Sequence, residues 1–97
     1  MTIKIKKADA FKAIKKEKDN SIDLLITSPP YNIGKEYETK KSFDNYLKPY
    51  EEFANDLFKK IKKTGSICWQ VGNYVHKGEI IPLDIPFYSI FANAGFK

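Results

Sequence analysis

The segment from Ser21 to Pro30 constrains the fold most, because an apolar strand is followed almost at once by two prolines. The apolar residues of this strand do not alternate strictly with polar ones: Ile22, Leu24, Leu25 and Ile26. This pattern is typical of a central parallel strand that is covered on both faces. Pro29 and Pro30 cannot donate to a sheet ladder and fix φ at about −65°, so the strand must end there. The sequence therefore predicts a buried strand over Ser21–Thr27 with a stiff rim at its carboxyl end.

A strand and a helix are predicted before this segment. Ile3 and Ile5 alternate with lysines over Thr2–Lys7, which indicates a short strand with one buried face. Asp9 can act as an N-cap, and the spacing of the apolar residues after it predicts an amphipathic helix over about Ala10–Lys18.

A long helix and a second buried strand are predicted after it. Apolar residues recur every three or four positions from Asn45 to Lys62 or Lys63, and Gly65 can take the left-handed cap of that helix. These residues are Tyr46, Leu47, Tyr50, Phe53, Ala54, Leu57, Phe58 and Ile61. Ser66–Val71 is again apolar, so Cys68 and Trp69 are expected in the core.

The last predicted helix extends from about Pro86 to Ala94, with Gly95 as its cap. The resulting order of strand, helix, strand, helix, strand, helix indicates an α/β fold with a mainly parallel sheet. Each unit takes roughly 30 residues, so 97 residues hold about three strand-helix units, about half of a doubly wound sheet.

A half sheet leaves an open edge and uncovered helix faces. Tyr50, Phe53, Leu57 and Phe87 are expected to be partly uncovered. Because large exposed apolar patches promote association, we expect self-association, with a homodimer as its simplest form.

Charge and cysteine usage narrow the function classes. The net charge is +5 and every one of the 17 basic residues is Lys. A positive chain favours a polyanionic partner, but Arg makes the commonest contacts to guanine, so its absence indicates that this stretch does not read base edges.

One cysteine and one histidine exclude a disulfide framework and a zinc cluster. No apolar run is long enough to span a bilayer and no signal peptide is recognisable, which makes a reducing cytoplasm the expected location.

The rim Ser28-Pro29-Pro30-Tyr31 carries the candidate chemistry. The Ser28 hydroxyl and the Pro29 carbonyl can accept hydrogen bonds from an exocyclic amine, and Tyr31 can stack on a planar base. Such acceptors leave the amine lone pair aimed at an electrophile, which suits methylation of a flipped-out nucleotide. The alternative is that these residues form only a turn and that Tyr31 covers a core edge.

The longer string from Asn20 to Lys35 resembles the catalytic motif region of DNA amino-methyltransferases that use S-adenosylmethionine, in the permuted group whose catalytic motif comes first. Leu57–Asn73 is similar to the next helix and strand of that family, with Lys63-Thr64-Gly65-Ser66-Ile67 and Trp69-Gln70-Val71-Gly72-Asn73 as the matching strings. The segment Ile81–Ile85 and the string Ala94-Gly95-Phe96 resemble the part that follows. The resemblance implies a Rossmann-like methyltransferase fold, with DNA as partner in a restriction-modification context.

The resemblance also implies site residues. Ser28, Pro29, Pro30 and Tyr31 match the motif that binds the target base, and the form beginning with Ser is associated mostly with cytosine N4 rather than adenine N6. Asp9 matches a position that borders the cofactor, although Ala8 stands where the family often has Gly. The alternative for Asp9 is a simple helix cap.

Two parts of the family pattern are absent from residues 1–97. No string resembles the glycine-rich cofactor loop, since the glycines at 34, 65, 72, 78 and 95 form no G-x-G, and no target-recognition segment follows. We therefore expect an N-terminal, catalytic-motif fragment that is inactive alone or active only with a second chain. An inactive nucleic-acid-binding or interaction module, and a truncated product without function, remain open.

Overall fold

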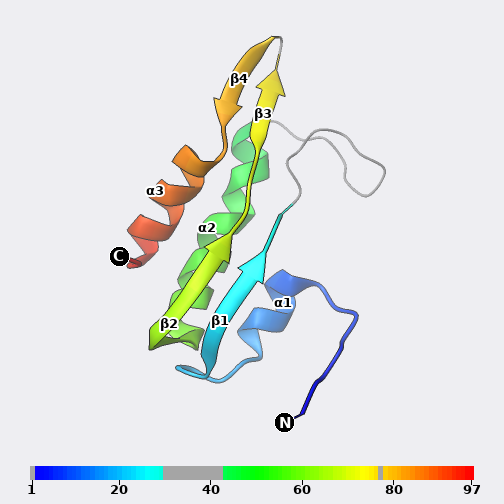
Figure 1. Cartoon of the computed structure of the whole chain (residues 1–97), viewed down its shortest axis with the longest axis vertical. Helices are drawn as coiled ribbons and strands as arrows, with labels where there is room; N and C mark the ends of the chain where they lie inside the picture. The colour runs from blue at the N-terminus through cyan, green and yellow to red at the C-terminus, as the bar shows by residue number, and fades with distance from the viewer. Residues whose placement is uncertain (1, 30–42, 77) are drawn as a thin grey trace.

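The computed structural model describes residues 2–29, 43–76 and 78–97. Its elements, in chain order, are α1 (Ala10–Lys15), β1 (Ile22–Thr27), α2 (Phe43–Lys60), β2 (Ile61–Trp69), β3 (Asn73–His76), β4 (Glu79–Pro82) and α3 (Asp84–Ala94) (Figure 1). The predicted α/β class is confirmed, with two parallel strands and flanking helices. No helix in the described ranges is both long and apolar enough to cross a bilayer.

The centre of the fold is the parallel pair β1 and β2, joined through α2. Leu24 lies opposite Ser66 and Thr27 opposite Trp69 in the register. Figure 1 shows α2 behind this pair, with α1 and α3 on either side of it. The alternation of side chains turns Leu25 and its partner Ile67 toward the helices, where both pack against the core.

The core is predominantly aromatic and lies between the helices and one face of the sheet. Tyr50, Phe53, Leu57 and Phe87 are 8%, 6%, 0% and 2% exposed. The expectation that these four residues would be partly uncovered is wrong, because α3 packs on α2 and closes the apolar faces of both helices. Trp69 joins the same cluster, with its ring centroid 5.7 Å from that of Tyr50.

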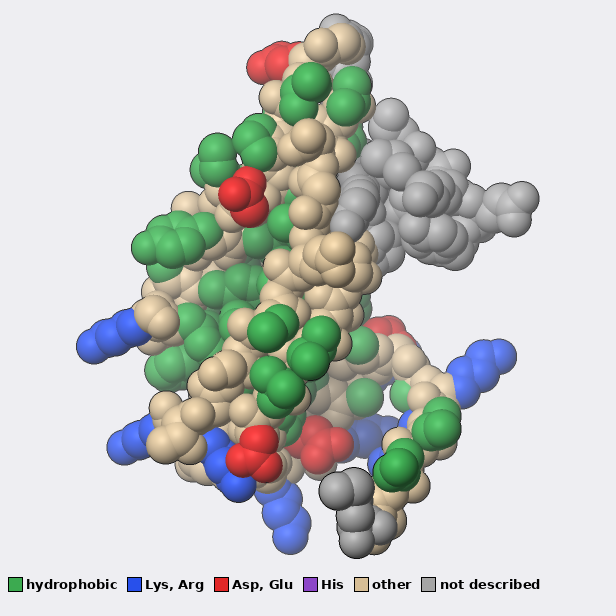
Figure 2. Space-filling view, viewed as in Figure 1, with side chains coloured by type: hydrophobic (Ala, Val, Ile, Leu, Met, Phe, Trp, Pro, Cys, Tyr) green, Lys and Arg blue, Asp and Glu red, His purple; other side chains and the backbone are tan. Residues whose placement is uncertain are grey.

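The uncovered surface is instead the other face of the sheet. Leu24 and Ile26 are 52% and 70% exposed, and Cys68, the register partner of Ile26, is exposed too. The predictions that β1 is covered on both faces and that Cys68 is buried are therefore wrong for this chain. Figure 2 shows hydrophobic side chains over β1 and β2 on the face that points away from α2.

The N-terminal segment departs from its prediction. Residues 2–9 form no strand, and Ile3 and Ile5 are 80% and 94% exposed. An alternating pattern becomes a strand only beside a partner, and this segment pairs with neither β1 nor β2. Helix α1 ends at Lys15 rather than Lys18, since Ile14 is the last apolar residue with a core to pack on.

Gly65 has a different role from the predicted helix cap. Helix α2 ends at Lys60, β2 begins at Ile61, and Gly65 lies inside the strand. A Cβ atom there would lie 2.7 Å from Ile61 Cγ1 and 3.0 Å from the carbonyl oxygens of Ile22 and Asp23. Gly65 thus allows β1 to approach closely where the register shifts between Ile22 and Leu24.

A hairpin, β3 and β4, lies between β2 and α3, in a stretch for which the sequence pattern predicted no strand. Tyr74 pairs with Ile81 in it, and Tyr74 is 3% exposed. Helix α3 then begins at Asp84, two residues before the expected Pro86, which fits in its first turn because it needs no N–H there. The Gly95 cap is confirmed, with φ of 120° and its N–H donating to Ala92 and Phe91.

Candidate functional site

The candidate rim lies where the two parallel strands end. Because β1 and β2 are parallel, their carboxyl ends share one edge of the sheet. The Gln70 N–H donates to the Thr27 carbonyl oxygen at 2.9 Å, which carries the ladder one residue past the end of β2. The residue that follows Thr27 is Ser28, so the ladder holds the start of the rim at this edge.

The two described residues of the rim differ in environment. Ser28 is exposed at the end of β1, whereas Pro29 is buried. A buried ring with fixed φ gives the exposed residue beside it a restrained backbone. Neither side chain carries a charge, so this part of the rim can accept hydrogen bonds from an amine but cannot act as a strong base. Pro30 and Tyr31 lie outside the described residues.

Asp9 is on another element, at the start of α1. Its carboxylate accepts a hydrogen bond from the Phe11 N–H at 2.9 Å, and its carbonyl accepts from Ala13 at 2.8 Å. The predicted N-cap is therefore confirmed. Phe11 packs edge-on against Phe53 at 5.3 Å between ring centroids, so the cap also fixes how α1 sits on α2.

Ion pairs reinforce the docking of α1. The Lys15 ammonium lies 2.7 Å from Asp56 and 2.9 Å from Glu52, both on α2. Hydrogen bonds to the Asp56 and Glu52 carboxylates raise the pKa of Lys15 above its ordinary value, while its partial desolvation works against that rise. Lys15 therefore remains a cation throughout the neutral range.

Other lysines surround a hollow beside α1. A cavity of about 540 Å³ is lined by Lys6, Lys12, Lys16 and Lys18, with Asp9 and Glu17 as the acidic residues. Four ammonium groups against two carboxylates leave this hollow positive. Such a surface attracts phosphates without selecting a sequence.

The described residues do not form a complete site for S-adenosylmethionine. A glycine-rich turn that admits a cofactor needs closely spaced glycines. The space beside Gly65 is instead occupied by β1, Gly78 lies in the hairpin turn and Gly95 caps α3.

Sequence reasoning missed two features near this edge. Hairpin β3–β4 has a positive φ of 78° at Gly78, and a glycine between two short apolar runs is the signal that could have revealed it. The second is the indole Nε1 of Trp69, which is buried and has no hydrogen-bond partner among residues 2–29, 43–76 and 78–97. No signal in the sequence could have shown this.

Together, the described elements form a parallel α/β core with a polar-proline rim at the carboxyl end of its first strand. The family model described as DNA methylase matches residues 22–96, which is most of the chain. The chain belongs to this N6/N4 DNA methylase family.

Individual relatives support this family assignment. The chain is 47% identical over 78 residues to the type II methyltransferase M.BglII of Bacillus subtilis, covering 79% of this chain and 22% of the relative. It is 36% identical over 88 residues to the type II methyltransferase M.HpaI of Haemophilus parainfluenzae, covering 84% of this chain and 27% of the relative.

A solved structure supports the fold. The crystal structure of TTHA0409 from Thermus thermophilus, provisionally assigned as a DNA modification methylase, matches with a TM-score of 0.76 and 21% identity. The match covers 92% of this chain and 37% of that one. The chain thus spans well under half the length of the relatives it matches. The resemblance seen in the sequence is confirmed at the level of the family.

Proposed function

We propose that residues 1–97 are the catalytic-motif part of a DNA methyltransferase domain, and that Ser28, Pro29, Pro30 and Tyr31 hold the target base. The observation that carries this proposal is the position of Ser28 and Pro29, directly after β1 at the shared carboxyl edge of the sheet. Ligands of open α/β sheets bind at this edge. Membership of the DNA methylase family supplies the reaction class.

In this proposal the rim orients an amine rather than deprotonating it. The Ser28 hydroxyl and the Pro29 carbonyl accept hydrogen bonds from the exocyclic amine of a flipped base, and Tyr31 stacks on its ring. S-adenosylmethionine would supply the methyl group, as an electrophile facing the lone pair of the amine that the Ser28 and Pro29 oxygens orient. Asp9 is the residue of this chain proposed to border that cofactor.

Cytosine N4 is the amine we favour over adenine N6. The support is Ser28 as the first residue of the motif, since the family form beginning with Ser is associated mostly with cytosine. DNA is the partner, and the lysine hollow beside α1 is suited to phosphates. The setting we infer is a restriction-modification system in the cytoplasm.

The same proposal makes the isolated chain inactive, because its described residues do not complete the cofactor site. The alternative is a non-catalytic nucleic-acid-binding or interaction module. The lysine hollow supports this alternative, because a positive surface binds phosphates without any cofactor. Salt-sensitive DNA binding without any calorimetric response to S-adenosylmethionine, with or without a complementing chain, would identify such a module.

The test is methyl transfer from labelled S-adenosylmethionine to DNA by the full chain mixed with the part of M.BglII outside the matched 78 residues, produced as a separate polypeptide. Mass spectrometry of the digested DNA identifies the modified base. We expect N4-methylcytosine, and we expect Ser28→Ala to lower turnover by roughly tenfold or more, as loss of one hydrogen bond to the reacting group does.

The matched control is Ser66→Ala, an exposed serine on β2 away from the rim, which should leave turnover unchanged. N6-methyladenine as the product would overturn the base preference alone. A mixture that binds DNA and cofactor but transfers no methyl group would overturn the proposed function.

A further inference from the structure

Gln70 lies beside the rim, at the end of the neighbouring strand. Thr27 is opposite Trp69 in the register of the parallel pair. The Gln70 N–H donates to the Thr27 carbonyl oxygen at 2.9 Å, so the ladder continues one step and places Gln70 opposite Ser28. Neighbouring strands are about 4.8 Å apart, which makes Gln70 and Ser28 direct neighbours at the carboxyl edge of the sheet.

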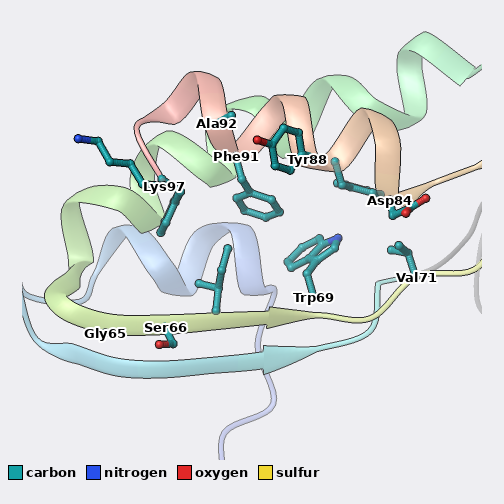
Figure 3. Close-up of a pocket in the computed structure, with 12 residues that line it drawn as sticks. Gly65, Ser66, Trp69, Val71, Asp84, Tyr88, Phe91, Ala92 and Lys97 are labelled. Carbon is teal, nitrogen blue, oxygen red and sulfur yellow. The ribbon is translucent and has the colours of Figure 1, made fainter.

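The Gln70 side chain projects from the sheet face that points away from the helices. Figure 3 shows Ser66 of β2 pointing away from the helices, whereas Trp69 and Val71 point toward them. Because successive side chains of a strand alternate, Gln70 points to the same side as Ser66. Gln70 is exposed there, so its amide is accessible to a ligand.

Ser28 points to the same side as Gln70. It follows the exposed Ile26 by two residues, so the alternation of β1 places both side chains on one face. The Ser28 hydroxyl and the Gln70 amide therefore lie side by side, on two strands whose backbones are fixed to each other.

Gln70 supplies the hydrogen-bond donor that the proposed base site still needs. In the proposed function, the Ser28 hydroxyl and the Pro29 carbonyl accept from the exocyclic amine, so neither donates to the base. The ring nitrogen next to that amine, N3 of cytosine or N1 of adenine, carries a lone pair that requires a donor. The Gln70 amide has two N–H donors, and its longer side chain can reach past the hydroxyl to that nitrogen.

We propose that Gln70 is a further base-binding residue, whose side-chain amide donates to the ring nitrogen next to the reacting amine. This inference rests on the proposed function. Acceptors at the rim and a donor at Gln70 together select an amine beside an unprotonated ring nitrogen, the pattern on the Watson–Crick edge of cytosine and adenine. Thymine and guanine present an oxygen beside a ring N–H, so that oxygen would face the carbonyl of Pro29, which cannot donate.

The experiment compares the natural base with an analogue that has C–H in place of the ring nitrogen. The full chain is mixed with the remainder of M.BglII as a separate polypeptide. The duplex carries 3-deazacytosine at the methylated position, or 1-deazaadenine if the product is N6-methyladenine.

Two effects on kcat/KM are expected. Gln70→Leu should lower kcat/KM on the natural duplex at least about tenfold, because the ring nitrogen loses its donor. The analogue should slow the unsubstituted chain at least about tenfold more than it slows Gln70→Leu, which has no donor left to lose. Thr64→Val, at an exposed residue near the start of β2, is the matched control and should discriminate like the unsubstituted chain.

A second measurement does not depend on methyl transfer. Gln70 is the single glutamine of the chain, so labelling with ¹⁵N-glutamine gives one pair of side-chain amide signals. We expect these signals to move downfield when the natural duplex binds to the mixture, and to move less with the analogue.

Two results would overturn the proposal. One is equal slowing of the unsubstituted chain and Gln70→Leu by the analogue, and the other is side-chain amide signals that stay unmoved when the duplex binds. A mixture that transfers no methyl group but still shows the shift would refute the proposed function and support the contact between Gln70 and the base.

Discussion

Substitutions at Gly65 test the sharpest structural departure from the sequence prediction. As a helix cap with positive φ, Gly65 would tolerate Asn better than Ala. Inside β2, the limit is space: a Cβ would approach Ile61 Cγ1 to 2.7 Å, and carbon atoms rest about 3.5–4.0 Å apart. Two backbone carbonyl oxygens at 3.0 Å prevent the Cβ from moving away.

The expected cost follows from this crowding. Overpacking typically costs about 1–3 kcal/mol, against a total stability of about 5–15 kcal/mol for a domain. With a urea dependence of about 2 kcal/mol per M, Gly65→Ala should lower the midpoint of unfolding by roughly 0.5–1.5 M. Gly65→Asn should lower it further, because its side chain is larger.

The assay is urea denaturation followed by far-UV circular dichroism. Gly78 is the matched control, since its φ is 78° and a Cβ atom added there would meet nothing within 4 Å. There the order should reverse, with Asn tolerated better than Ala. If Gly65→Asn were as stable as Gly65→Ala or more so, the close-approach explanation would be refuted.

Three further predictions concern the packing of the helices. Phe87→Ala should destabilise the chain by about 3–5 kcal/mol in urea denaturation, whereas Tyr88→Ala, at a residue 76% exposed, should change stability by less than about 0.5 kcal/mol; equal effects would contradict the described core. Asp9→Ala should cost about 0.5–2 kcal/mol and speed hydrogen exchange in α1, and Asp9→Ser should restore most of the loss; an unchanged exchange rate would argue against the cap. Because folding raises the pKa of Lys15, its ion pairs contribute fully below the unfolded pKa of about 10.4 and lose that contribution as the pH rises through the folded pKa. Lys15→Met should therefore remove part of the fall in stability above that pH, and identical pH profiles for the two proteins would contradict this.

Local sequence signals predicted the elements whose partners lie within the chain. The periodicity around Tyr50 and Leu57 located α2, and the apolar run before Thr27 located β1. Both elements pack apolar side chains against the same core. Asp9 and Gly95 were predicted as caps because a cap depends on residues within one turn.

The missed features depend on partners that the sequence pattern cannot locate. Ile3 and Ile5 alternate like a strand but find no neighbour, and Ile26 and Cys68 belong to a sheet face that no described element covers. Within the rim, the position of Ser28 at the sheet edge followed from the prolines after it. The sequence could not show that Pro29 is buried while Ser28 is exposed, because burial is set by tertiary packing.

The most direct test of the central proposal is methyl transfer from labelled S-adenosylmethionine to DNA, measured for the 97-residue chain alone and with the remainder of a relative such as M.BglII. We predict no transfer above background by the chain alone and clear transfer by the mixture, abolished or strongly reduced by Ser28→Ala. Robust turnover by the chain alone would contradict the proposal that it lacks its own cofactor site. Unchanged turnover of a fully assembled mixture that carries Ser28→Ala would contradict the proposal that Ser28 holds the base.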